Sequence, residues 1–131
     1  MNNLFEKYVL EGKEKTNSLK KRLSDIESVL LELRIALLES DIEIVIEPIS
    51  NNQGVGFKTD ISTDFFMKKF ITVTMPKSER EAYILERNGD LVSFKTIDDL
   101  VARIGSIISS VSFWHEVENL KKMDENKENP F

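Results

Sequence analysis

The first forty residues carry a repeat of apolar positions that is typical of a long amphipathic helix. Alternating steps of four and three residues separate Leu19, Leu23, Ile26, Leu30, Leu33 and Leu37. Such spacing predicts a heptad seam along one face of the helix. A second row widens this face near the helix end, and it consists of Leu31, Ile35 and Leu38. We therefore expect the end of the helix to lie on a sheet and its beginning to project.

The residues before Leu19 predict a weaker helix. The seam is interrupted at Gly12 and Thr16, and a glycine inside a helix costs about 1 kcal/mol relative to alanine. We therefore expect a break or hinge between Gly12 and Ser18. A small apolar cluster precedes this break, and it consists of Leu4, Phe5, Tyr8 and Val9.

The first part of the seam has two interpretations. A narrow apolar seam suits a partner helix, whereas a wide apolar face suits packing on a sheet. The residues concerned are Leu19, Leu23, Ile26 and Leu30. They form either the self-association surface of a homo-oligomer or one side of the chain's own core.

The middle of the chain alternates apolar and polar residues with the period of two that strands require. The predicted strands cover residues 42–47, 55–61 and 69–75, and a hairpin over residues 83–94 follows them. In the strand over 69–75 we expect two faces, with Ile71, Val73 and Met75 toward the core and Phe70, Thr72 and Thr74 on the other side. Asn88-Gly89 in the hairpin tolerates the positive φ angles of a type I′ turn. Short connections between sequential strands predict an antiparallel meander of four to five strands.

Two helices are predicted after the strands. Thr96 can cap the first helix, and Asp98 and Asp99 lie in its first turn, where the helix dipole favours negative charge. A shorter helix begins near Phe113. From Lys121 on the chain is polar apart from Met123 and the last two residues, which predicts a flexible acidic tail over 123–131. The predicted fold class is α+β, with a single domain over residues 1–122.

This order of elements is similar to that of RWD-type interaction domains, which can also follow a coiled coil. The Tyr-Pro signature of that family is missing from this sequence, so the resemblance is one of architecture. Small acidic secretion chaperones resemble the chain in size, charge and mixed α/β content. Both resemblances imply binding rather than catalysis.

The composition indicates one globular domain. The chain has 131 residues, of which 40% are hydrophobic and 31% are charged, enough for a single core. It has no cysteine, which suits a reducing compartment. It shows no secretory signal and no apolar run of about 18 residues that could cross a bilayer, so we expect a cytoplasmic protein. The net charge of −5 without a basic stripe argues against duplex DNA and favours a basic partner protein.

Few residues could support catalysis or metal binding. His115 is the only histidine, and a zinc site usually needs three or four nitrogen or sulfur ligands. Helix capping explains Asp98 and Asp99, and no serine lies in a nucleophile-elbow pattern. The sequence therefore predicts a protein that is not an enzyme and that needs no cofactor or metal.

Aromatic and cationic residues interleave at one place, which comprises Phe65, Phe66, Lys68, Lys69 and Phe70. Proteins that bind single-stranded nucleic acid stack bases on aromatic rings and hold phosphates with nearby cations. Two alternatives are open. The phenylalanines could complete the core at the start of a strand, or they could form an exposed patch for a protein partner.

The last nine residues resemble the acidic tail of bacterial single-stranded-DNA-binding proteins, which ends in Pro-Phe and docks on repair and replication enzymes. The resemblance is carried by Asp124, Glu125, Glu128, Pro130 and Phe131. It implies that Phe131 enters an apolar pocket of a partner while the acidic residues steer the approach. Lys127 and Asn129 depart from the family pattern, because Lys127 interrupts the acidic run and Asn129 replaces an apolar residue.

The sequence thus predicts a protein-interaction module, such as an adaptor, an inhibitor or a chaperone, that forms a homodimer. The alternative is an accessory protein in single-stranded-DNA metabolism that uses its Pro-Phe tail.

Overall fold

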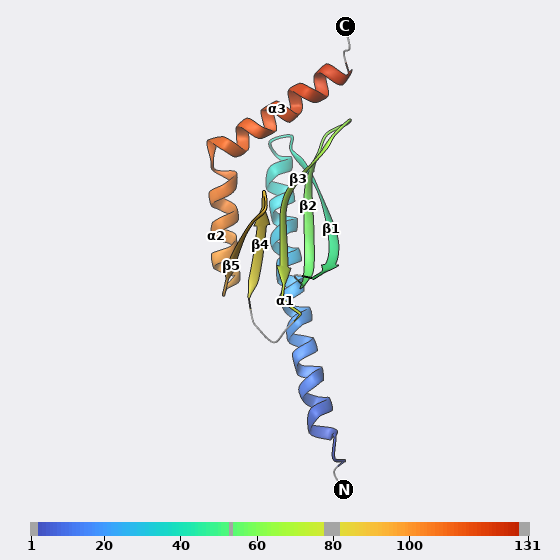
Figure 1. Cartoon of the computed structure of the whole chain (residues 1–131). Helices are drawn as coiled ribbons and strands as arrows, with labels where there is room; N and C mark the ends of the chain where they lie inside the picture. Colours follow the sequence, from blue (N-terminus) through green and yellow to red (C-terminus); the bar gives the residue numbers. More distant parts are fainter. Residues whose placement is uncertain (1–2, 53, 78–81, 129–131) are drawn as a thin grey trace.

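The computed structural model describes residues 3–52, 54–77 and 82–128. A long helix opens the chain, five strands follow it, and two helices close it (Figure 1). These elements are α1 (Glu6–Leu38), β1 (Glu43–Asn51), β2 (Gly54–Ser62), β3 (Met67–Met75), β4 (Tyr83–Arg87), β5 (Asp90–Phe94), α2 (Ile97–Ile108) and α3 (Val111–Glu128). The predicted α+β class and its order of elements are confirmed.

The strands form one antiparallel sheet in the order β1-β2-β3-β4-β5. This is the predicted meander. Asn88 and Gly89 join β4 to β5 with φ angles of 54° and 87°, so both central turn residues have the positive φ that the sequence predicted.

Helices α1 and α2 contact each other, and both pack on the sheet, α1 against β1 and β2 and α2 against β4 and β5. Figure 1 shows α3 crossing one end of the sheet. The core lies between these layers and includes Ile26, Leu30, Ile44, Ile61, Val73, Leu85, Leu100, Ile104, Phe113 and Val117. One row on the opposite face of the sheet comprises Glu47, Lys58, Thr72, Glu86 and Leu91.

Helix α1 is continuous from Glu6 to Leu38, so the predicted break between Gly12 and Ser18 is wrong. Helix propagation adds a hydrogen bond for each residue that it fixes, and a single glycine therefore does not end the helix. The hydroxyl of Thr16 also donates to the carbonyl oxygen of Gly12 at 2.8 Å within this stretch. The core face is narrower than predicted, because Ile35 and Leu38 are exposed.

The strand β3 contains an irregularity that the sequence analysis missed. Lys58 pairs with Thr72 and Asp60 pairs with Lys69, so Thr59 lies opposite two residues of β3, Phe70 and Ile71. An extra residue of this kind is a β-bulge. Phe70 and Ile71 both belong to the buried core, and the prediction that Phe70 lies on the opposite face is therefore wrong.

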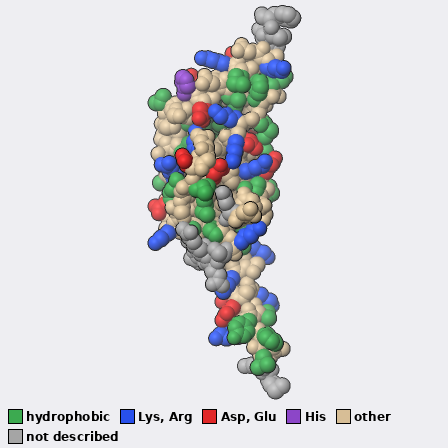
Figure 2. Space-filling view, viewed as in Figure 1, with side chains coloured by type: hydrophobic (Ala, Val, Ile, Leu, Met, Phe, Trp, Pro, Cys, Tyr) green, Lys and Arg blue, Asp and Glu red, His purple; other side chains and the backbone are tan. Residues whose placement is uncertain are grey.

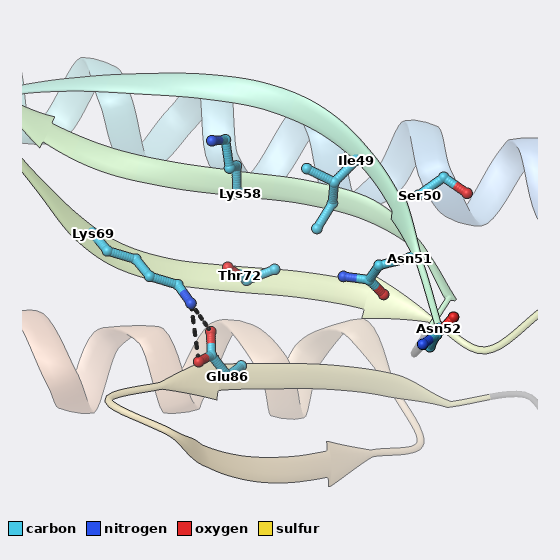
Figure 3. Close-up of a pocket in the computed structure, with 8 residues that line it drawn as sticks. All are labelled: Ile49, Ser50, Asn51, Asn52, Lys58, Lys69, Thr72 and Glu86. Atoms are coloured by element: carbon cyan, nitrogen blue, oxygen red, sulfur yellow. Dashed lines mark hydrogen bonds and ion pairs between the residues drawn. The ribbon is translucent and has the colours of Figure 1, made fainter.

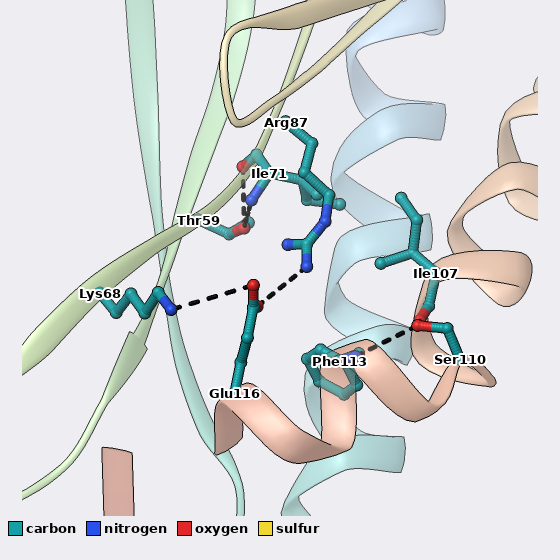
Figure 4. A network of polar contacts seen from close by, with 8 residues as sticks. All are labelled: Thr59, Lys68, Ile71, Arg87, Ile107, Ser110, Phe113 and Glu116. Carbon is teal, nitrogen blue, oxygen red and sulfur yellow. Dashed lines mark hydrogen bonds and ion pairs between the residues drawn. The ribbon is translucent and has the colours of Figure 1, made fainter. Parts of the chain in front are cut away.

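The side chain of Thr59 completes the bulge. Its hydroxyl accepts a hydrogen bond from the backbone N–H of Ile71 at 3.1 Å and donates one to the carbonyl oxygen of Ile71 at 2.8 Å (Figure 4). Thr59 is fully buried. A threonine hydroxyl thus replaces the strand-to-strand bonds that the bulge removes.

The C-terminal helices match the prediction at the start of α2 but not at the end of α3. Thr96 caps α2 by accepting a hydrogen bond from the N–H of Asp99 at 3.1 Å, as predicted. Helix α3 continues to Glu128, so residues 123–128 of the predicted flexible tail are helical. Pro130 and Phe131 lie outside the described residues. Among the helices of the described chain, none has the length and apolar character of a transmembrane span.

Candidate functional site

The four residues predicted for self-association lie mostly inside the folded chain. Ile26 and Leu30 have 0% exposure, and Leu19 and Leu23 are half-buried and pack against the same core. This placement contradicts self-association through Ile26 and Leu30, because neither side chain reaches the surface. The seam serves the chain's own core from Leu19 onward, which was the second interpretation.

The N-terminal part of α1 has the opposite character. Every side chain from residue 3 to residue 18 is exposed, and Figure 1 shows this part of the helix extending past the sheet. Phe5, Tyr8 and Val9 are 67%, 66% and 53% exposed. We call residues 5–16 the projecting segment; at 1.5 Å per residue they span about 18 Å. The part that projects therefore precedes Leu19, whereas the part predicted to project began at Leu19 and packs against the core instead.

Hydrophobic side chains cluster on the projecting segment in the space-filling view (Figure 2, lower end). The large exposed apolar residues there are Phe5, Tyr8, Val9 and Leu10, and Leu4 directly precedes them. Single exposed apolar residues are ordinary, but a contiguous group marks an interaction surface. The projecting segment is therefore the strongest candidate functional site in the described chain.

The residues of the predicted nucleic-acid patch separate in the structure. Phe70 is 1% exposed, so its ring is not available for base stacking, and Phe66 is partly buried against the core. Lys69 forms an ion pair with Glu86 at 3.0 Å, and the Lys68 ammonium lies 4.0 Å from Glu116. Phe65 alone of the three phenylalanines is exposed. The structure favours the alternative in which this segment completes the core at a strand entry.

Glu116 holds α3 to the sheet through the same segment (Figure 4). Its carboxylate accepts a hydrogen bond from the Arg87 guanidinium at 2.9 Å. That guanidinium lies 5.3 Å from the centre of the Phe70 ring, and the Phe70 ring lies 5.2 Å from Phe113. Because the Glu116 and Arg87 side chains are largely buried, this ion pair holds α3 to the sheet, and the two charges compensate each other.

Within the described residues, one hydrogen bond joins the predicted acidic tail to the rest of the chain. The Asp124 carboxylate accepts a hydrogen bond from the backbone N–H of Phe65 at 2.9 Å. Glu125 is exposed on α3, and Glu128 is the last residue of this helix. The predicted docking residues Pro130 and Phe131 lie outside the described part of the chain.

A shallow depression of about 520 Å³ lies on the sheet face opposite α1 and α2 (Figure 3). Its lining includes Lys58, Lys69, Thr72 and Glu86. Lys69 is paired with Glu86, and Lys58 is paired with Glu47 at 3.3 Å. The charges of the depression are thus neutralised within the sheet, which makes it a weak site for an ionic ligand.

Among the described residues, no group of three or more His, Cys, Asp or Glu side chains could hold a metal ion.

The apolar cluster that includes Phe5 and Val9 was visible in the sequence, but its connection to the core seam was not predicted. The connection lies in residues that are not hydrophobic. Gly12 and Thr16 continue the alternating steps of four and three from Val9 to Leu19. The spacing therefore indicates one helix face that runs from Phe5 to Leu37, which the predicted break at Gly12 had divided into two parts.

Comparisons with protein-family models, with curated proteins and with solved structures give no match to this chain.

Proposed function

We propose that this protein is a non-catalytic protein-interaction module, acting as an adaptor, an inhibitor or a chaperone, and that the projecting segment is its binding element. The observation that carries the proposal is the exposed apolar group at the start of α1, with Tyr8 and Val9 on the helix and Phe5 at its N-cap. Figure 1 shows this part of the helix extending beyond the sheet.

The stability of short helices supports this proposal. An isolated helix of fewer than about 12 residues is marginal in water, and most helices in proteins are stabilised by packing of one apolar face. The projecting segment is held at one end by the packed part of α1 and leaves its own apolar face in water. A partner that covers this face would bury apolar surface and stabilise the helix at once.

The proposal predicts site-specific crosslinking. A photoreactive phenylalanine analogue placed at Tyr8 should give covalent adducts in extract of the source cells. The same analogue at Leu91, an exposed apolar residue of β5, should not. The adducts at position 8 should disappear when Phe5 and Val9 are both replaced by serine. Mass spectrometry of the adducts would identify the partner. Equal labelling at both positions, or adducts that survive the double serine replacement, would contradict the proposal.

The alternative, a role in single-stranded-DNA metabolism, predicts a measurable affinity for oligonucleotides that falls with salt. We expect no such affinity at physiological salt, because Phe70 is buried and Lys69 is paired with Glu86. Fluorescence anisotropy with a labelled single strand would test this expectation, with Lys69→Ala as the comparison. A micromolar dissociation constant that weakens with salt and with Lys69→Ala would favour the alternative.

A further inference from the structure

The row of core-facing positions on α1 continues into the projecting segment at the same spacing. Phe5, Val9, Gly12 and Thr16 precede Leu19 at the same alternating steps that connect the core positions. Because α1 is one unbroken helix from Glu6 and the N–H of Val9 bonds the carbonyl oxygen of the N-cap residue Phe5 at 3.0 Å, these residues lie on the same face as Leu19 and Leu23. The sheet covers this face from Leu19 onward and leaves it exposed before Leu19.

We propose that the exposed part of this face pairs with the same face of a second copy of the chain, with the two helices antiparallel. This inference rests on the proposed function and names its partner. The register places Phe5 opposite Thr16 of the second copy and Val9 opposite Gly12. Each large side chain then meets a small one, which is how well-packed helix interfaces fill their volume.

The sizes of these residues favour the antiparallel arrangement. A parallel pair in register would place Gly12 against Gly12 and leave a void, and voids are costly. In the antiparallel pair Val9 fills the space above the glycine. The Thr16 hydroxyl is already bonded to the Gly12 carbonyl oxygen of its own helix, so it needs no further partner at the interface.

The charges beside the seam complement each other in the same register. Glu6 directly follows Phe5, and Lys13 directly follows Gly12, so both residues flank the seam on the same side. In the antiparallel pair Glu6 lies beside Lys13 of the second copy, and the two-fold symmetry repeats this pairing. Exposed ion pairs add little stability, typically about 0.2–1 kcal/mol each, but they discriminate between helix orientations.

The two helices would overlap over residues 5–16, and this is the part of the helix that does not pack against its own core. It ends at Thr16, before Leu19, where α1 begins to pack against its own core. The rest of each chain therefore lies beyond the N-terminal end of the other helix and does not compete for the interface. Because only a short helical segment is buried, we expect a weak dimer, with Kd on the order of 100 μM.

A charge-swap series tests the pairing with the purified full chain. Sedimentation equilibrium at concentrations around the expected Kd should show a monomer–dimer equilibrium. Glu6→Lys should weaken the dimer by about tenfold, and adding Lys13→Glu to the same chain should restore it. Glu14→Lys makes the same charge change on the opposite side of the helix and should have no effect. A wild type that stays monomeric, or a double variant that is as weak as Glu6→Lys, would overturn the proposal.

Disulfide crosslinking tests the orientation, and the chain has no cysteine of its own. A mixture of Phe5→Cys and Thr16→Cys chains should form a mixed disulfide, because a disulfide requires Cα atoms within about 7 Å. Phe5→Cys alone should not crosslink to itself, and Leu10→Cys, on the opposite side of the helix, should crosslink to neither. A self-linked Phe5→Cys chain would overturn the antiparallel arrangement. Should the purified chain stay monomeric while position 8 labels another protein, the proposed function stands and the partner is that protein.

Discussion

Replacing Ile26 by glutamate is expected to unfold this protein, whereas the same replacement of Phe5 leaves it folded. Both residues lie on the same face of α1, but Ile26 is 0% exposed and Phe5 is 67% exposed. A carboxylate at position 26 would lose its hydration and would also remove core packing. We expect a loss of about 4 kcal/mol or more, which is most of the free energy of unfolding of a domain at the lower end of the usual range of about 5–15 kcal/mol.

Circular dichroism and urea unfolding measure this difference directly. Phe5→Glu should keep the helical signal and an unfolding midpoint close to that of the wild type, and it should lose partner binding. The double replacement of Leu23 and Ile26 by glutamate should also unfold, rather than give the folded monomer that a self-association seam would give. A cooperative, native-like transition for Ile26→Glu would show that this part of α1 is not core.

Thr59→Val is expected to destabilise the fold by about 2–4 kcal/mol, although valine has nearly the same shape. The Thr59 hydroxyl bonds both the N–H and the carbonyl oxygen of Ile71, and the site is fully buried. Valine would leave both backbone groups without a partner. Each buried polar group that loses its hydrogen bond costs about 1–3 kcal/mol.

Thr72→Val is the matched control. Thr72 is also buried in the sheet, but its hydroxyl forms no side-chain hydrogen bond within the described chain. Its replacement should change the free energy of unfolding by less than about 0.5 kcal/mol. Equal effects of the two replacements in urea unfolding would mean that the bulge does not depend on the Thr59 hydroxyl.

One face of α1 is buried in its later part and exposed in its first part, the projecting segment. The alternating steps of four and three continue from Phe5 to Leu37, although Gly12 and Thr16 are not hydrophobic, and this face packs against the core only from Leu19 onward. The extent of the sheet, and not a break in the helix or in its spacing, therefore decides where the core ends and the proposed binding surface begins.

Local features were predictable from the sequence because the residues that determine them are neighbours in the chain. The turn at Asn88-Gly89 needs two residues that tolerate positive φ, and both have it. The start of α2 needs a hydroxyl three residues before a free N–H, and Thr96 provides it for Asp99. The period of two over the strands and the heptad spacing of α1 likewise act over a few residues, and they determined the order of elements.

Only the tertiary structure decided the features that depend on residues far apart in sequence. Phe70 is buried because Thr59 of the neighbouring strand stabilises a bulge, and α3 is held to the β2–β3 loop because Asp124 accepts a hydrogen bond from Phe65. The sequence by itself determined the elements and their order, and it located the apolar cluster at Phe5 and Val9. It could not separate core from surface along α1, since the alternating spacing of four and three is the same where the sheet covers the helix and where the sheet has ended.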